Sequence, residues 1–159
     1  LKLGQVDKAR GVLDHLFSEA PARLYKASAH GIQYAQIARA EVQLSMGRHD
    51  HALETVRQAL AASQRADFRL EEIAANRVLG QVLAATGDRA ASEAAFRRSL
   101  ALLHEVQCPP EHAQTLLAYG RFRRGDNAQE DRDLVERALR LFEEMKATGW
   151  IREARSALA

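Results

Sequence analysis

Three side chains of the kinds that bind zinc lie within one short stretch of the sequence. They are His104, Cys108 and His112, each four residues from the next. Imidazole nitrogen and thiolate sulfur are common protein ligands of zinc. Two prolines follow the cysteine, however, and proline disfavours helix at the residue before it, so a shared helix face is not expected. No fourth ligand is apparent. The sequence therefore favours an ordinary thiol in a loop between surface histidines, and it predicts neither a metal nor a cofactor.

A second polar cluster is His49-Asp50-His51. Residues two apart do not lie on the same face of a helix, so the two imidazoles are not expected to form a joint site. Short polar side chains at the start of a helix commonly accept hydrogen bonds from its free N–H groups. Capping of the following helix by His49 or Asp50 is therefore the preferred interpretation.

Paired acidic residues occur at Glu71-Glu72, Glu130-Asp131 and Glu143-Glu144. General acid–base catalysis needs carboxylates in a desolvated cleft with shifted pKa values. The surrounding pattern instead predicts that each pair lies on a solvated helix face. The chain also has no glycine-rich phosphate loop and no Gly-x-Ser-x-Gly sequence. The sequence thus predicts a protein that is not an enzyme.

Basic side chains are densest at Arg121, Arg123 and Arg124, with Phe122 among them. Nucleic acid could use such a patch, but cations also favour the C-terminal end of a helix dipole. The whole chain has 23 basic and 21 acidic side chains, for a formal net charge of +2. Because nucleic-acid binding usually needs a concentrated basic face, a solvated helix end is the favoured interpretation.

The expected compartment is the cytoplasm. No apolar run approaches the ~20 residues that span a membrane, and no signal peptide is visible. The single cysteine, Cys108, cannot form an internal disulfide, which fits a reducing compartment.

The elements that position these residues are predicted to be helices, because good helix formers are abundant and no run of alternating β-branched residues occurs. Four short turns contain Gly4, Gly47, Gly87 and Gly125, which are separated by 43, 40 and 38 residues. Glycine adopts the left-handed conformation just past a helix end, and an Asp or another polar residue can then cap the next helix. Apolar residues recur with a helical period on both sides of each turn. The expected helices are 6–18, 22–46, 49–65, 68–86, 88–106, 110–124, 128–147 and 149–158, with a distorted turn near Asn127.

The best-defined repeat has Leu79-Gly80 before its turn glycine, then Gly87, Phe96 and Leu100. This pattern resembles the tetratricopeptide (TPR) repeat, which has a Leu-Gly in its first helix, Gly at the turn and an aromatic residue in its second helix. The family's usual Trp is replaced by Asn76. The period exceeds the usual ~34 residues, and in this respect the chain resembles the long-period arrays of bacterial signalling ATPases and of the maltose-responsive transcription activator. The resemblance implies an all-α fold, a right-handed superhelical stack of antiparallel helix pairs (an α-solenoid) with about eight helices.

The predicted organisation is a single domain over residues 1–159. It comprises a half repeat at 1–20, repeats at 21–66, 67–106 and 107–147, and a capping helix at 148–159. Because Leu1 to Gly4 enter in mid-repeat, we expect the chain to be part of a larger protein.

In the family, the first helix of each pair lines a concave groove that binds partners. When positions are counted back from the turn glycines of this chain, the resemblance implies the following groove residues: Tyr34, Ile37, Glu41, Ser45, Arg77, Gln81, His112, Thr115, Tyr119 and Phe122. This mixture of aromatic and charged side chains suits recognition of a peptide or small molecule.

The leading hypothesis is a regulatory interaction segment of a multidomain bacterial signalling or transcription-regulating protein. It would bind a protein partner, or an effector domain of its own parent, in the groove. Two alternatives are a small-molecule sensor and a self-assembly module that uses an open N-terminal end. No membrane or nucleic-acid partner is expected.

Overall fold

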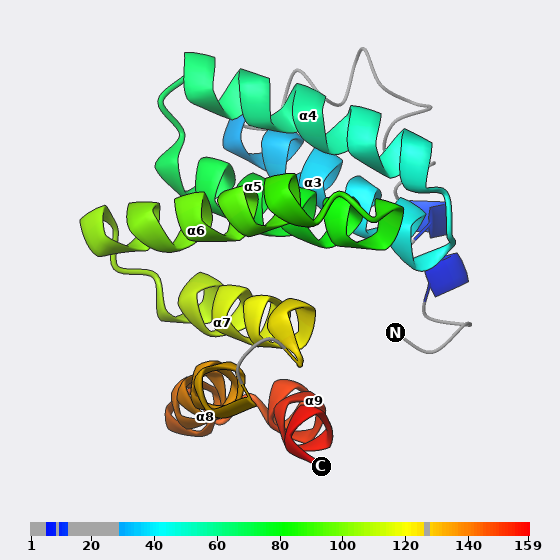
Figure 1. Ribbon diagram of the computed structural model, residues 1–159. Helices are drawn as coiled ribbons and strands as arrows, with labels where there is room; N and C mark the ends of the chain where they lie inside the picture. Colours follow the sequence, from blue (N-terminus) through cyan, green and yellow to red (C-terminus); the bar gives the residue numbers. More distant parts are fainter. Residues whose placement is uncertain (1–5, 9, 13–28, 126–127) are drawn as a thin grey trace.

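The computed structural model describes residues 6–8, 10–12, 29–125 and 128–159, and every regular element in these ranges is an α-helix. Residues 6–8 and 10–12 are helical, and the later helices carry the labels of Figure 1. Their bounds are Ala29–Ser45 (α3), His49–Arg65 (α4), Arg69–Thr86 (α5), Arg89–Glu105 (α6), Pro109–Arg123 (α7), Ala128–Glu144 (α8) and Thr148–Leu158 (α9). The all-α prediction is confirmed, and the bounds of α4 are those predicted. The predicted turns at Gly4 and Asn127 lie outside the described residues.

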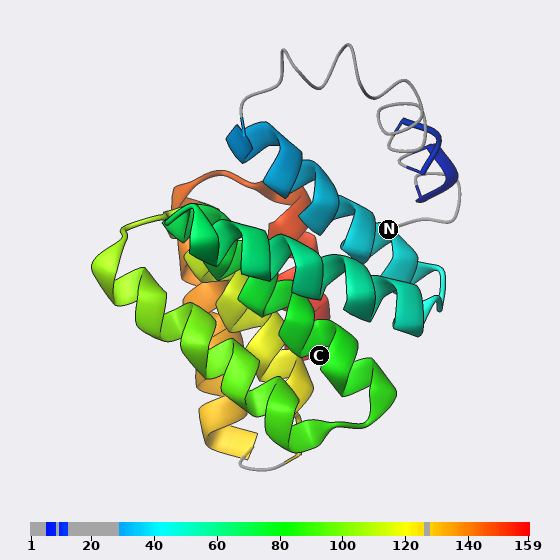
Figure 2. The ribbon, with the colours of Figure 1, turned by 90° about the horizontal axis from the view of Figure 1, so that it is seen from above.

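The helices form antiparallel pairs that stack on one another (Figure 1). α3 pairs with α4, α5 with α6 and α7 with α8, and α9 packs on α8. α5 also contacts α3 and α7, so the first helices of successive pairs lie side by side. The view from above in Figure 2 shows the pairs rotated relative to one another along the stack. We call the side formed by α3, α5 and α7 the first-helix surface.

The core lies between the helices of each pair and between successive pairs. Small residues allow close approach: a Cβ added at Gly80 would lie 2.9 Å from ring atoms of Phe96 in α6. The hydroxyl of Ser92 donates a 2.8 Å hydrogen bond to the carbonyl of Gly80 at the same contact. In the next pair, a Cβ at Gly120 would meet Cγ2 of Val135 in α8 at 2.7 Å. These two glycines therefore mark equivalent positions in α5 and α7, 40 residues apart.

The turn glycines have the predicted left-handed backbone, with φ of 72° at Gly47, 85° at Gly87 and 105° at Gly125. At Gly87 the next amide, of Asp88, bonds back to the carbonyl of Leu83 at 3.0 Å, which closes the last turn of α5. The carboxylate of Asp88 accepts from the amide of Ala91 at 3.1 Å, so this helix cap is as predicted.

Two turns between repeats have the same left-handed geometry without glycine. Asp67 has φ of 56° and Lys146 has φ of 55°. The amide that follows each one bonds back across the turn, from Phe68 to Ser63 and from Ala147 to Phe142, both at 2.9 Å. A non-glycine residue in this conformation is strained by its Cβ. The predicted helices 49–65 and 68–86 leave a break at Asp67, whereas the predicted helix 128–147 runs past Lys146, because no glycine marks either turn.

The capping prediction for His49 and Asp50 is wrong. The residue at the N-cap of α4 is Arg48, and no side chain accepts a hydrogen bond there. His49 and Asp50 already belong to the first turn of the helix, where Asp50 still interacts favourably with the helix dipole.

Candidate functional site

The centre of the first-helix surface is an ion-pair network around Arg77. Its Nη1 atom donates to Oε1 of Glu41 in α3 at 2.7 Å, and its Nε atom donates to Oε2 of Glu111 in α7 at 3.1 Å. Nη1 also lies 3.5 Å from Oε1 of Gln81, one turn along α5. Arg77 is only 5% exposed. One buried guanidinium thus joins three successive first helices.

The energetic balance of this network follows from its burial. Burial acts to lower the pKa of Arg77, but the attraction and hydrogen bonds of Glu41 and Glu111 outweigh it and raise the pKa. A buried cation that loses its partners is strongly destabilising. Arg77 therefore holds the surface together and is too enclosed to serve as its first contact with a partner.

Tyr34 is the exposed aromatic residue of this surface, with 39% of its area open to solvent. Its pKa is raised to about 12 by partial burial and then by Glu71, Glu111 and Cys108, while Arg77 acts in the opposite direction. The phenol therefore stays neutral in an acidic neighbourhood. Tyr34 belongs to α3, and the pKa of its phenol is affected by Cys108 and Glu111 at the start of α7. The starts of α3 and α7 are therefore close to each other on this surface.

Glu71 and Glu72 are buried, which corrects the prediction of a solvated acidic pair. They are 2% and 3% exposed. Oε1 of Glu71 lies 2.6 Å from Nδ1 of His30, whose ring stacks on Phe68 at 3.8 Å between centroids. Glu72 accepts from Arg98 at 3.0 Å. The sequence showed these residues only as neighbouring acids, since His30 and Arg98 come from other helices.

Of the other two acidic pairs, only one member is buried. Asp131 is 5% exposed, and its Oδ2 accepts from the amide of Gly125 at 3.1 Å. Glu130, Glu143 and Glu144 are exposed as predicted.

The predicted groove residues of α3 and α5 differ in their accessibility. Glu41 and Gln81 are partly exposed, and Ser45 is exposed, with its hydroxyl donating to the carbonyl of Val42. Ile37 is a correction: it is 2% exposed and belongs to the core between α3, α4 and α5.

The predicted groove residues of α7 lie on a different face from the one expected. Thr115 is fully buried and shares a hydrogen bond with Ser99 of α6. Tyr119 is 4% exposed, and its hydroxyl donates to Glu93 of α6 at 2.5 Å. The rings of Tyr119 and Phe122 pack on Phe96 of α6, with centroids 5.4 and 5.5 Å away.

The reason is a change of helix phase. Gly80 precedes its turn glycine by seven residues, but Gly120 precedes Gly125 by only five. Counting back from the turn therefore misplaces every residue of α7 by two positions, or about 200° around a helix. Counting from the close-packed glycines makes Arg121 the equivalent of Gln81, and Glu111 at the start of α7 then faces Arg77.

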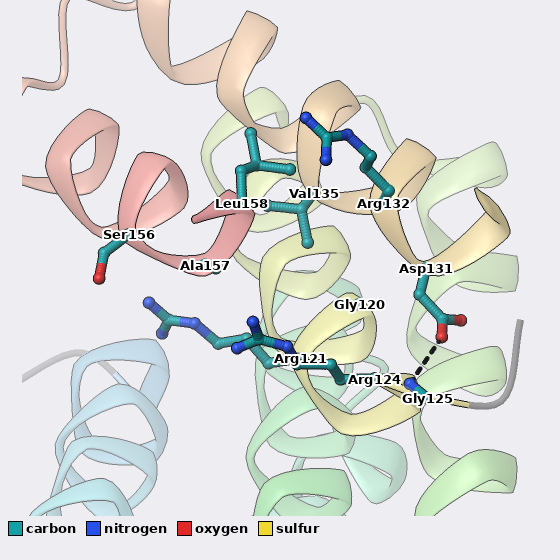
Figure 3. A pocket seen from close by; sticks show the side chains of 10 residues that line it. All are labelled: Gly120, Arg121, Arg124, Gly125, Asp131, Arg132, Val135, Ser156, Ala157 and Leu158. Carbon is teal, nitrogen blue, oxygen red and sulfur yellow. Dashed lines mark hydrogen bonds between the residues drawn. The ribbon is translucent and has the colours of Figure 1, made fainter. Parts of the chain in front are cut away.

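A pocket of about 550 Å³ lies beside this corrected face, between the end of α7, the first half of α8 and the end of α9 (Figure 3). Arg121, Arg124 and Arg132 line it, with Val135 and Leu158 as apolar wall. Arg121 also donates to the Glu153 carbonyl at 3.0 Å and so links α7 to α9. Two of these arginines belong to the basic patch that the sequence indicated.

The tetratricopeptide repeat family model matches residues 31–105, which cover α3 from Gly31 to the end of α6. These residues are a tetratricopeptide repeat array. The predicted resemblance is thereby confirmed for the part of the chain that holds most of the Arg77 network. No curated protein and no solved structure matches the chain.

Tetratricopeptide repeats generally mediate protein–protein interaction, and the family is non-catalytic. In the described ranges, no group of three or more His, Cys, Asp or Glu side chains is arranged to hold a metal ion. Cys108 is a free thiol at the N-cap of α7. The pKa of His112 is lowered by partial burial, then by Arg137 and His104.

Among the helices described here, none is both long and apolar enough to cross a membrane.

Proposed function

We propose that this chain is a protein-interaction module whose first-helix surface binds a peptide segment of a partner. The observation that supports the proposal is the convergence of three successive first helices on Arg77. That network fixes the backbone of the surface and leaves the half-exposed Glu41 and Tyr34 at its edge. A preorganised surface loses little entropy on binding, which favours affinity.

The chemistry of the surface near α3 selects a basic partner. Arg77 is matched by two carboxylates, so Glu41 and Glu111 together leave one negative charge in excess. Glu71 adds a further carboxylate near Tyr34. A lysine or arginine of the partner would approach Glu41 and stack on the Tyr34 ring, an arrangement that cation–π attraction stabilises.

The three equivalent positions Glu41, Gln81 and Arg121 give the surface a direction. They lie 40 residues apart on α3, α5 and α7 and change from acidic through neutral to basic. A bound segment would therefore place its basic end beside α3 and its acidic end beside α7. Complementary charge of this kind contributes more to orientation and specificity than to affinity.

The test is selection of peptides from a random library on the intact chain, followed by fluorescence anisotropy. Tyr34→Ala and Glu41→Gln should each weaken the binding of the selected peptides by about tenfold, the size expected for a side chain that contributes directly to an interface. Glu54→Gln, on the exposed face of α4, is the matched control and should leave the affinity unchanged. Selected peptides that bind all three variants alike would remove the first-helix surface from the proposal.

The wider setting that we propose is a regulatory segment of a cytoplasmic, multidomain bacterial signalling or transcription-regulating protein. The partner would then be another protein or an effector domain of the same parent. This part rests on the long repeat period and its resemblance to the arrays of signalling ATPases. The gene's flanking sequence tests it directly: an ATPase, kinase, cyclase or DNA-binding module in the same open reading frame is the expected result, and a gene that encodes none of these contradicts it.

No specific observation favours a small-molecule sensor on the first-helix surface. Most of the N-terminal end that a self-assembly module would use lies outside the described residues.

A further inference from the structure

A buried carboxylate joins α4, α5 and α6 at the edge of the array. Glu72 of α5 accepts from Nη2 of Arg98 in α6 at 3.0 Å and from Nε2 of Gln64 in α4 at 3.3 Å. Nη1 of Arg69 donates to its other oxygen at 3.2 Å. We call these four residues the Glu72 cluster. One acid here satisfies donors from the second helix of one pair and from both helices of the next.

The corresponding place between α6, α7 and α8 holds bases instead of an acid. Corresponding residues are 40 apart between α4 and α6 and between α5 and α7, as the turn glycines and the close-packed glycines show. They are 39 apart between α6 and α8, as Phe96 and Val135 show. The corresponding residues are His104 for Gln64, His112 for Glu72, Arg137 for Arg98 and Pro109 for Arg69.

The packing beneath both places supports this correspondence. Ile73 and Ser99 directly follow the acid and the α6 arginine of the Glu72 cluster, and the Ser99 hydroxyl donates to the Ile73 carbonyl at 3.0 Å. Both residues are fully buried. Ala113 and Ala138, which directly follow the corresponding histidine and arginine, are also fully buried and belong to one hydrophobic cluster. The two places therefore lie at the same point of successive helix pairs.

The three bases are close enough to act on one another. The pKa of His112 is lowered by partial burial, then by Arg137 of α8 and His104 of α6. His104 and Arg137 are exposed and His112 is partly exposed, so an incoming group can reach all three. A carboxylate placed among them would be attracted by each and would accept charge-assisted hydrogen bonds from the guanidinium and the protonated rings.

We propose that His104, His112 and Arg137 bind a carboxylate of an acidic partner segment, which takes the position that the Glu72 carboxylate has in the preceding pair. The source is a protein segment, because tetratricopeptide repeats generally mediate protein–protein interaction. The site goes beyond the first-helix surface: it uses the edge where α6 ends, and it selects acid where the region near α3 selects base.

Binding at this site is coupled to a proton. A bound carboxylate favours the charged form of His112, whereas burial and the two neighbouring bases disfavour that form in the free protein. The complex therefore takes up a proton, and the affinity rises as the pH falls.

The probe is a tetraglutamate peptide with blocked ends, and the neutral control is a blocked tetraglutamine peptide. Their binding to the intact chain is followed through the histidine ring protons by NMR, at about pH 6 and about pH 7.5. Tetraglutamate should raise the titration midpoint of His112 and bind about fivefold more tightly at the lower pH. Tetraglutamine should do neither. An unchanged His112 titration at millimolar tetraglutamate would overturn the proposal.

Two matched arginine variants separate the site from diffuse attraction. Arg137→Gln should weaken tetraglutamate binding by about fivefold or more near pH 6, because it removes a direct partner of the carboxylate. Arg57→Gln, on the exposed side of α4, should leave the affinity within about twofold. Equal losses in the two variants would overturn the proposal.

His112→Glu supplies the carboxylate from within the chain. It should abolish tetraglutamate binding and raise the ratio of folded to unfolded protein in urea relative to His112→Gln. An acid near the start of a helix is also favoured by the helix dipole, so a double-mutant cycle with Arg137→Gln isolates the site. The gain should be about fivefold smaller in the Arg137→Gln background, the size of one charge-assisted hydrogen bond. An equal gain in both backgrounds would contradict the proposed geometry.

Discussion

Gly80 is the position at which the packing of α5 on α6 can be tested most sharply. An added Cβ would lie 2.9 Å from three ring atoms of Phe96, whereas carbon atoms in favourable contact are about 3.5–4.0 Å apart. The ring would have to move by about half an ångström or more to restore that distance. It has no room to do so, because Phe96 is fully buried beneath Tyr119 and Phe122.

The expected cost of Gly80→Ala is the difference between two terms. Overpacking a core costs about 1–3 kcal/mol, and the enclosed ring places this site at the upper end. Alanine favours the helix by about 1 kcal/mol relative to glycine. The free energy of unfolding should therefore fall by about 1–2 kcal/mol, which corresponds to a drop in Tm of roughly 2–8 °C for a chain of this size.

Urea unfolding followed by far-ultraviolet circular dichroism measures this loss. Gly149→Ala in α9 is the control, since no heavy atom lies within 4 Å of its added Cβ. It should leave stability unchanged or raise it by up to about 1 kcal/mol. In a double-mutant cycle, Phe96→Leu should cost less in the Gly80→Ala background than alone, because the smaller side chain relieves the clash. A Gly80→Ala variant as stable as Gly149→Ala would refute the close approach of α5 and α6.

Three other predictions concern the turns, the central ion pairs and pH. Asp67→Gly and Lys146→Gly should each raise the free energy of unfolding in urea by about 1 kcal/mol, because glycine relieves the left-handed strain; destabilisation would contradict the turn geometry. Arg77→Ala should cost about 3–5 kcal/mol, whereas Glu41→Gln, at a half-exposed carboxylate, should cost under about 1 kcal/mol; equal losses would show that Arg77 is not buried. His112 has a lowered pKa, so its share of stability is present above the unfolded value of 6.5 and is lost as pH falls below it. NMR titration of its ring protons should give a midpoint below that value, and His112→Gln should flatten the acid loss of stability.

The repeat architecture could be predicted from sequence because its signals are local. Glycine at positions 47, 87 and 125 marks a backbone conformation that other residues avoid, and the apolar period on either side shows the helices. The turns at Asp67 and Lys146 have the same backbone hydrogen bonds, but a side chain is strained in each of them. No glycine marks these two turns in the sequence. The face that α7 turns toward the first-helix surface could not be predicted either. It is set by the close contact between Gly120 and Val135, which only the three-dimensional structure shows.

The candidate site was harder to predict because α5 does not behave as an amphipathic helix. It has neighbours in α3, α4, α6 and α7, and all eight residues from 71 to 78 are buried. An apolar stripe identifies the inner face of a helix only when the opposite face meets water. In the central helix of a stack, polar side chains are enclosed together with apolar ones, and each must find a hydrogen-bond or ion-pair partner.

That requirement links the packing of the array to its surface. Arg77 is buried because the stack encloses α5, and a buried charge has to be compensated by charged partners. Glu41 from α3 and Glu111 from α7 are these partners. The same two ion pairs tie the neighbouring first helices to α5, and so they set the spacing of the surface on which Tyr34 is exposed. A substitution that weakens Arg77 should therefore alter partner binding even though Arg77 itself is covered, whereas one at Tyr34 should alter binding without changing stability.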